Sequence, residues 1–248
     1  MPDLAWWAWA LLCLAAIVVG VSKTAVPGAN AISVAIFAAL LPARQSTGAL
    51  LVLLLVADLF AIVAYRRHVD WATLLRLAPA VVAGLLLGVL FLAFADDEGV
   101  RRVIGALLLA VIAFTLGWRR LRRAVEDPGP HRLAAATYGT LGGFTTMVAN
   151  AAGPVMSMYF LAARFPVKLW LGTAAWSFFL INVSKLPFSI GLGLITPSGL
   201  LLDLVLVPLV VAGALSGRWL AGRLDQRLFE RLVIGFTVVG ALYLLLAP

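Results

Sequence analysis

The sequence predicts an all-α polytopic membrane protein made of two inverted-topology repeats, and three observations support this fold class. Of the 248 residues, 63% are hydrophobic and 12% are charged, whereas a soluble domain has roughly 45–50% apolar and ~25% charged residues. Apolar runs close to the ~20 residues that cross a bilayer recur along the whole chain. Long and short runs follow the same order twice, which indicates an internal duplication.

About ten apolar segments are expected, in the order long, short, long, long, long in each half. They cover approximately residues 4–20, 29–41, 46–65, 73–95 and 101–118, and then 133–149, 152–163, 169–190, 200–222 and 231–247. Each repeat should contain about three full transmembrane helices plus a broken or re-entrant helix pair, or about 8–10 membrane segments in all. We place the first repeat at 1–118, a basic linker at 119–132 and the second repeat at 133–248.

The two halves also share sequence. PAVVAGLLLG, residues 79–88, matches PLVVAGALSG, residues 208–217, at a shift of 129 residues. The stretch from Gly48 to Asp58 matches that from Gly172 to Asn182 at a shift of 124. Different shifts fit loop insertions between equivalent helices. We interpret the GxxxG glycines in the first match as positions where neighbouring helices pack closely.

Charged loops orient the two halves in the membrane. The linker at 119–132 and the clusters at 66–68 and 218–231 are basic and are expected on the cytoplasmic side, whereas the acidic cluster at 96–98 is expected outside. This assignment makes the two halves inverted relative to each other and places both chain termini outside. It holds whether the first two segments of each half are two spans or one re-entrant hairpin.

Polar, glycine- and proline-containing interruptions lie at corresponding positions of the two halves. GVSKTAVPGAN occupies residues 20–30, and GFTTMVANAAGP follows at residues 143–154, a shift of 123. In transporters built from inverted repeats, such interruptions form the substrate site near the membrane midplane. Each one precedes a short helix, whose free N–H groups and dipole favour an anion. We therefore expect two helix N-termini to face one another around an anion.

Polar side chains in and near the interruptions are candidate binding groups. The first interruption supplies Lys23, Thr24, Pro27, Gly28 and Asn30, and the second supplies Thr145, Thr146, Asn150 and Gly153. The next segment of each half adds Asp58, Asn182 and Lys185. Lys23 contributes a full positive charge, and ionisable groups inside apolar spans suggest a function. We predict substrate contacts for all of these residues except Asp58, which is predicted to couple transport or to form an ion pair.

Structural roles are alternatives for several of these residues. Lys23 would also fit near a membrane surface, with its ammonium group extended to water. Asp58 would fit as a structural partner of Lys23 or Lys185, or as a proton-coupling group. Asn150 and Asn182 are suited to hydrogen bonds between helices. Lys185 precedes a proline kink that it would stabilise through a freed backbone carbonyl.

The sequence predicts no catalytic residues, metal site or cofactor. The only histidines, His68 and His131, lie in charged loops, and Cys13 is the single cysteine. A zinc-binding HExxH motif and an ATP-binding P-loop are both absent from the sequence. An intramembrane enzyme is therefore the least favoured alternative, whereas a passive anion channel stays open because it would use the same helix N-termini.

At these residues the sequence resembles the TauE/SafE family of sulfite exporters, also called the toluene-sulfonate uptake permease family. The resemblance is carried by GVSKTAVPGAN, VADLFAIVAYRRHVDW, GFTTMVANAAGP and INVSKLPFSIGLG, and it covers nearly the whole chain. It implies a secondary transporter for sulfite, sulfoacetate or another organosulfonate or sulfur oxyanion in a bacterial cytoplasmic (inner) membrane. The expected partners are a small anion and the lipid bilayer, and not nucleic acid; proton coupling and a homodimer are left open.

Overall fold

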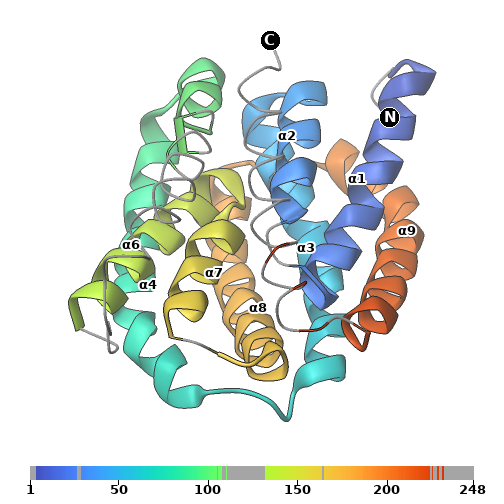
Figure 1. The fold of residues 1–248 in the computed structure, drawn as a ribbon. Helices are drawn as coiled ribbons and strands as arrows, with labels where there is room; N and C mark the ends of the chain where they lie inside the picture. Colours follow the sequence, from blue (N-terminus) through green and yellow to red (C-terminus); the bar gives the residue numbers. More distant parts are fainter. Residues whose placement is uncertain are drawn as a thin grey trace.

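A computed structural model describes residues 4–26, 29–104, 106–107, 110, 132–163 and 165–223, together with residues 225, 228 and 231. All regular structure in this part of the chain is helical. The helices form one bundle in which short helices lie among long ones (Figure 1). The first half contains α1 (Trp6–Thr24), α2 (Asn30–Leu40), α3 (Ala43–Tyr65) and α4 (Trp71–Phe94). The second half contains α6 (Arg132–Ala149), α7 (Ala152–Ala162), α8 (Val167–Gly191) and α9 (Pro197–Ala221).

Five of these helices, α1, α3, α4, α8 and α9, are long and apolar enough to cross a membrane. Every predicted segment that falls on described residues is a helix, so the all-α polytopic membrane fold is confirmed for this part of the chain. The predicted segment 101–118 lies partly outside the described residues, and the segment 231–247 and the linker 119–132 lie almost wholly outside them. The repeat boundaries therefore stay predictions.

The two helix interruptions are shorter than the predicted stretches 20–30 and 143–154. α1 continues to Thr24 and α6 continues to Ala149, so the interruptions comprise only about residues 25–29 and 150–151. The segments predicted at 133–149 and 152–163 agree with α6 and α7, whereas the first segment, predicted to end at residue 20, continues to Thr24. A Cβ atom on Gly20 or Gly143 would collide with a backbone carbonyl of a neighbouring helix. These glycines therefore serve close helix packing inside continuous helices.

Helices of one half pack against helices of the other half. α1 packs against α9 of the second half, and α6 packs against α4 of the first half (Figure 1). At the two interfaces, Gly213 approaches the carbonyl of Ile17, and Gly84 approaches the carbonyl of Thr140. The two glycines are 129 residues apart, and Ile17 and Thr140 are 123 residues apart, which are the shifts found in the sequence. The interpretation of the GxxxG glycines as packing positions is thus confirmed.

α3 and α8 pack against each other in antiparallel orientation. Gly48, near the start of α3, lies against the carbonyl of Leu194 just after α8. Gly172, near the start of α8, lies against the carbonyl of His68 just after α3. The short helices α2 and α7 contact each other, and α2 also packs against α1 and α3. This arrangement brings both interruptions to the pair α3 and α8.

Replacing Gly20 by Ala should lower the apparent Tm by about 2–10 °C, because the added methyl group collides with α9 and overpacking costs about 1–3 kcal/mol. The change would otherwise favour the helix, since Ala has the higher helix propensity. Gly191→Ala is the matched control, because no atom lies within 4 Å of a Cβ at that position. Heating followed by fluorescence-detected size-exclusion chromatography measures both variants. An unchanged Tm for Gly20→Ala would contradict the packing role.

Candidate anion-binding site

A pocket lies where both helix interruptions meet α3 and α8. Six of the predicted site residues line it: Lys23, Asn30, Thr146, Asn150, Gly153 and Asn182. Leu54 and Phe178 complete two of its walls. Leu54 is the middle residue of α3, and Phe178 lies within one residue of the middle of α8. The pocket is therefore halfway along two membrane-spanning helices, the depth at which inverted-repeat transporters bind their substrates.

Four other predicted site residues, which the structure describes, do not line this pocket. Thr24 and Thr145 are buried, and their hydroxyl groups donate to backbone carbonyls of their own helices, at 3.1 and 3.2 Å. Asp58 and Lys185 are fully buried and bond to residues that do line it. Pro27 and Gly28 lie outside the described residues. The roles of all these residues in substrate binding stay predictions.

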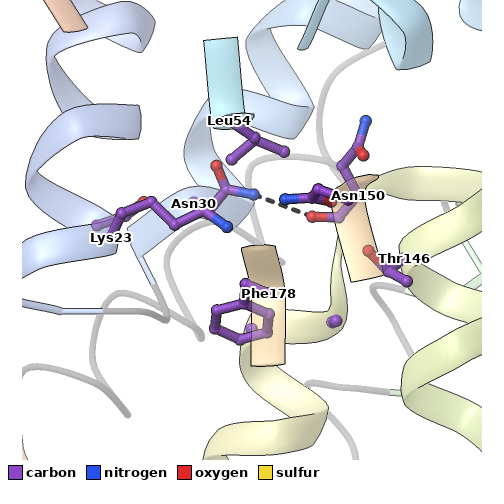
Figure 2. Close-up of a pocket in the computed structure, with 10 residues that line it drawn as sticks. Lys23, Asn30, Leu54, Thr146, Asn150 and Phe178 are labelled. Atoms are coloured by element: carbon purple, nitrogen blue, oxygen red, sulfur yellow. Dashed lines mark hydrogen bonds between the residues drawn. The ribbon is translucent and has the colours of Figure 1, made fainter. Parts of the chain in front are cut away.

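The starts of both short helices lie at the pocket. α2 begins at Asn30, and α7 begins with Ala152 and Gly153; all three residues line the pocket. N–H groups in the first turn of a helix have no partner within that helix. The two starts are also tied together, because the Asn30 side-chain amide donates to the backbone carbonyl of Asn150 at 2.9 Å (Figure 2). Two positive helix ends therefore converge on one pocket.

Lys23 places a cationic group at the pocket wall. Its Nζ lies 2.8 Å from Oδ1 of Asp58 and 4.5 Å from the centre of the Phe178 ring. The other oxygen of Asp58 accepts a hydrogen bond from the Asn182 amide at 2.7 Å. The Lys23 side chain is 8% exposed, so its ammonium group points into the protein and not toward a membrane surface. A cation over an aromatic face gains further electrostatic stabilisation.

Lys185 satisfies backbone and amide groups at the second interruption. Its Nζ donates to the carbonyl of Thr146 at 2.6 Å and to Oδ1 of Asn150. Asn150 has a φ of 51°, a left-handed conformation in which asparagine is among the better tolerated residues, and it follows the last residue of α6. The Asn150 amide nitrogen also donates to the carbonyl of Thr47 in α3, at 2.8 Å. Lys185 thus holds together the polypeptide that forms one pocket wall.

Four residues of the pocket were not predicted from the sequence: Ser22, Leu54, Ala152 and Phe178. The repeat contains a signal for two of them. Leu54 and Phe178 are separated by 124 residues, and each lies one helical turn before Asp58 or Asn182 on the same face. In a chain this apolar, individual leucine and phenylalanine residues carry no signal of their own.

The groups around the pocket suit an oxyanion. They comprise one ammonium group, three side-chain amides and the first turns of two helices. All of these can donate hydrogen bonds to acceptor oxygens, and the ammonium group makes the stronger, charge-assisted bonds. Among the described residues, no group of three or more His, Cys, Asp or Glu side chains is arranged to hold a metal ion.

A comparison with protein families shows to which family the chain belongs. The family model described as sulfite exporter TauE/SafE matches residues 12–244. The chain belongs to the TauE/SafE sulfite exporter family. This TauE/SafE match includes both interruptions and the whole pocket, and it confirms the resemblance found in the sequence. TauE/SafE proteins are membrane transporters, and this agrees with the expectation that the protein is not an enzyme. Searches among curated proteins and among solved structures gave no significant match.

Replacing Lys185 by Met in this TauE/SafE protein should lower its thermal stability strongly. The change leaves Oδ1 of Asn150 without this buried donor, and an unpaired buried group costs about 1–3 kcal/mol. The carbonyl of Thr146 loses one of its two donors and keeps the backbone N–H of Asn150. Lys168→Met is the matched control, because Lys168 is an exposed lysine on the same helix. Purified yield and Tm in detergent measure the effect. Equal stability of the two variants would show that Lys185 does not support the second interruption.

Proposed function

We propose that this protein is a secondary transporter that moves a small anion across a bacterial cytoplasmic membrane. The candidate substrates are sulfite, sulfoacetate and other organosulfonates or sulfur oxyanions. One observation carries the proposal: the ammonium group of Lys23 lies at the wall of a pocket halfway along the bundle, where the two short helices begin. A positive charge and two helix N-termini at the same point favour an anion over a neutral or cationic substrate.

The lining of the pocket suits a small substrate. Amides of Asn30, Asn150 and Asn182 suit sulfur-bound oxygens, whereas Leu54 and Phe178 suit a short carbon chain. The cavity volume is about 20 Å³, which is room for about one water molecule. The pocket must therefore widen to take up a sulfur oxyanion or a short organosulfonate.

The ion pair of Lys23 with Asp58 suggests how the anion is held and released. A bound anion competes with Asp58 for the ammonium group. Asp58 keeps the hydrogen bond from Asn182 at 2.7 Å, so its carboxylate is not left without a partner. The Asn182 amide is neutral, however, so the bound anion leaves the charge of Asp58 without its cation, and this cost limits how tightly the anion binds. The substrate is then bound tightly enough to enter and weakly enough to leave.

Alternating access around the pocket follows from two inverted repeats, 1–118 and 133–248, joined by a cytoplasmic linker at 119–132. The exchanged packing of α1 on α9 and α6 on α4 supports this organisation, as does the antiparallel pair α3 and α8. Rearrangement of one set of helices against the other would open the pocket to each side in turn. Both termini are proposed to lie outside.

Variants of the ion pair test the site. Lys23→Gln combined with Asp58→Asn removes both charges and should weaken anion binding about tenfold to a hundredfold, because charge-assisted hydrogen bonds contribute about 1.5–3 kcal/mol. Asp58→Asn alone frees the ammonium group of Lys23 and should strengthen binding. Thermal shift of the purified protein with sulfite, sulfoacetate and chloride measures affinity, since ligands of the folded state raise its stability. Unchanged binding and sulfite flux in the double variant would remove Lys23 from the mechanism.

Proteoliposome assays distinguish a carrier from a channel and from an enzyme. A carrier should take up labelled sulfite faster when unlabelled sulfite is trapped inside, and the rate should saturate with concentration. A channel can use the same helix N-termini but gives no such exchange. Conversion of sulfite to another product in detergent, without movement across a membrane, would favour an enzyme. Lys23→Gln/Asp58→Asn serves as the control with a defective site.

A further inference from the structure

A buried carboxyl group outside the pocket has no part in the proposed binding site. Asp203 lies in α9, and 2% of the residue is exposed. Neither oxygen of its side chain has a hydrogen-bond partner among the described residues. Among the described residues, Lys23, Asp58 and Lys185 are the other buried charged side chains, and both lysines have close partners. An ionisable group inside a membrane-spanning helix is costly, and by default it indicates a function.

Asp203 lies near the start of the packing face of α9. This face includes Asp203, Leu206, Val210, Gly213 and Gly217, which are buried and follow helical spacing. Gly213 on the same face contacts α1 at Ile17. In α4, the equivalent position is Leu74, which precedes Asp203 by 129 residues and is also buried. The second half therefore has a carboxyl group at a packing position where the first half has an apolar side chain.

No charged neighbour accounts for this carboxyl group. α9 packs against α1 and α3. The charged or titratable side chains of these two helices are Cys13, Lys23, Arg44, Asp58 and Tyr65. Lys23 and Asp58 pair with each other, Arg44 donates to backbone carbonyls at the end of α4, and Tyr65 donates to a backbone carbonyl of α1. Among the described residues, none of them forms a hydrogen bond or ion pair with Asp203.

We propose that Asp203 is a proton-binding site that couples anion transport to proton movement, an inference that rests on the proposed transport function. A neutral carboxyl group can be buried without a partner at far lower cost than a carboxylate. The closed packing of α9 therefore requires the protonated form. Ionisation requires water, and hence separation of α9 from α1 and α3 near Asp203. Asp203 lies about 9 Å along the helix from Pro197, the first residue of α9, at 1.5 Å per residue.

This geometry ties the proton to the movement of the substrate site. When the packing face opens to one compartment, the carboxylate takes up a proton and an O–H bond forms. That bond breaks when the face opens to the other compartment, and the proton passes to water there. α1, which packs on this face, carries Lys23 in its last turn. A change in the packing of α9 on α1 therefore affects the helix that carries Lys23, the proposed anion-binding residue. Asp58 is less suited, because Lys23 and Asn182 both stabilise its carboxylate.

Asp203→Asn and Asp203→Leu test the proposal in proteoliposomes. Sulfite uptake by the wild type should rise when the outside of the vesicles is more acidic than the inside, and a pH dye inside should report proton entry with sulfite. In both variants, sulfite exchange should persist, whereas uptake with and without the gradient should become equal. Glu98→Gln is the matched control, because Glu98 is an exposed carboxylate, and it should behave like the wild type. Unchanged Tm in the variants excludes simple loss of folding.

Infrared spectroscopy gives a second readout that does not depend on transport. The wild type should show the C=O stretching band of a protonated carboxylic acid, and Asp203→Asn should lack it. Absence of that band from the wild type, or net sulfite uptake without any proton entry, would overturn the role of Asp203 and leave the proposed transport function standing. Proton-coupled uptake in Asp203→Asn would overturn it in the same way. Failure of the wild type to exchange sulfite would overturn the proposed function itself, and the coupling role with it.

Discussion

Backbone groups left unpaired by two helix interruptions inside a bilayer constrain the whole structure. Water is not available there to satisfy them, so the protein must supply every partner. At the second interruption, Lys185 and Asn150 do this by connecting α6, α8 and α3, and Asn30 extends the connection to α2. The pocket exists because these bonds keep two helix starts exposed to each other. Without these bonds, each helix would be more stable if it continued without interruption through the membrane.

A nearly symmetric frame carries an asymmetric set of polar groups. Helix contacts recur at equivalent positions, as Gly84 and Gly213 demonstrate. The polar side chains do not recur, because Lys23 corresponds to Thr146 and Asp58 corresponds to Asn182. The first half thus supplies the buried ion pair, and the second supplies an amide to it and a lysine that holds the backbone. Equivalent helix contacts therefore surround chemically different polar groups in the two halves.

Glycine shows where prediction from sequence was limited. Gly20 and Gly143 lie beside polar residues, and the same residue type serves both to end a helix and to let another backbone approach. Only the neighbouring carbonyls of α9 and α4 distinguish the two uses. For a similar reason Leu54 and Phe178 were missed, because an apolar residue beside a substrate pocket and one in a packed core have the same local pattern. Asp203 was overlooked because its significance depends on having no partner.

The sequence by itself determined the helical membrane fold, the approximate helix positions and the family, because these follow from hydrophobicity, periodicity and motifs along one chain. It also located both interruptions, since glycine, proline and polar residues stand out against apolar spans. Only the tertiary structure decided that Lys23 pairs with Asp58 and that Lys185 serves the backbone of the second interruption. Both lysines are buried cations near an interruption, and their roles differ only through the atoms within about 3 Å of each ammonium group, the range of a hydrogen bond.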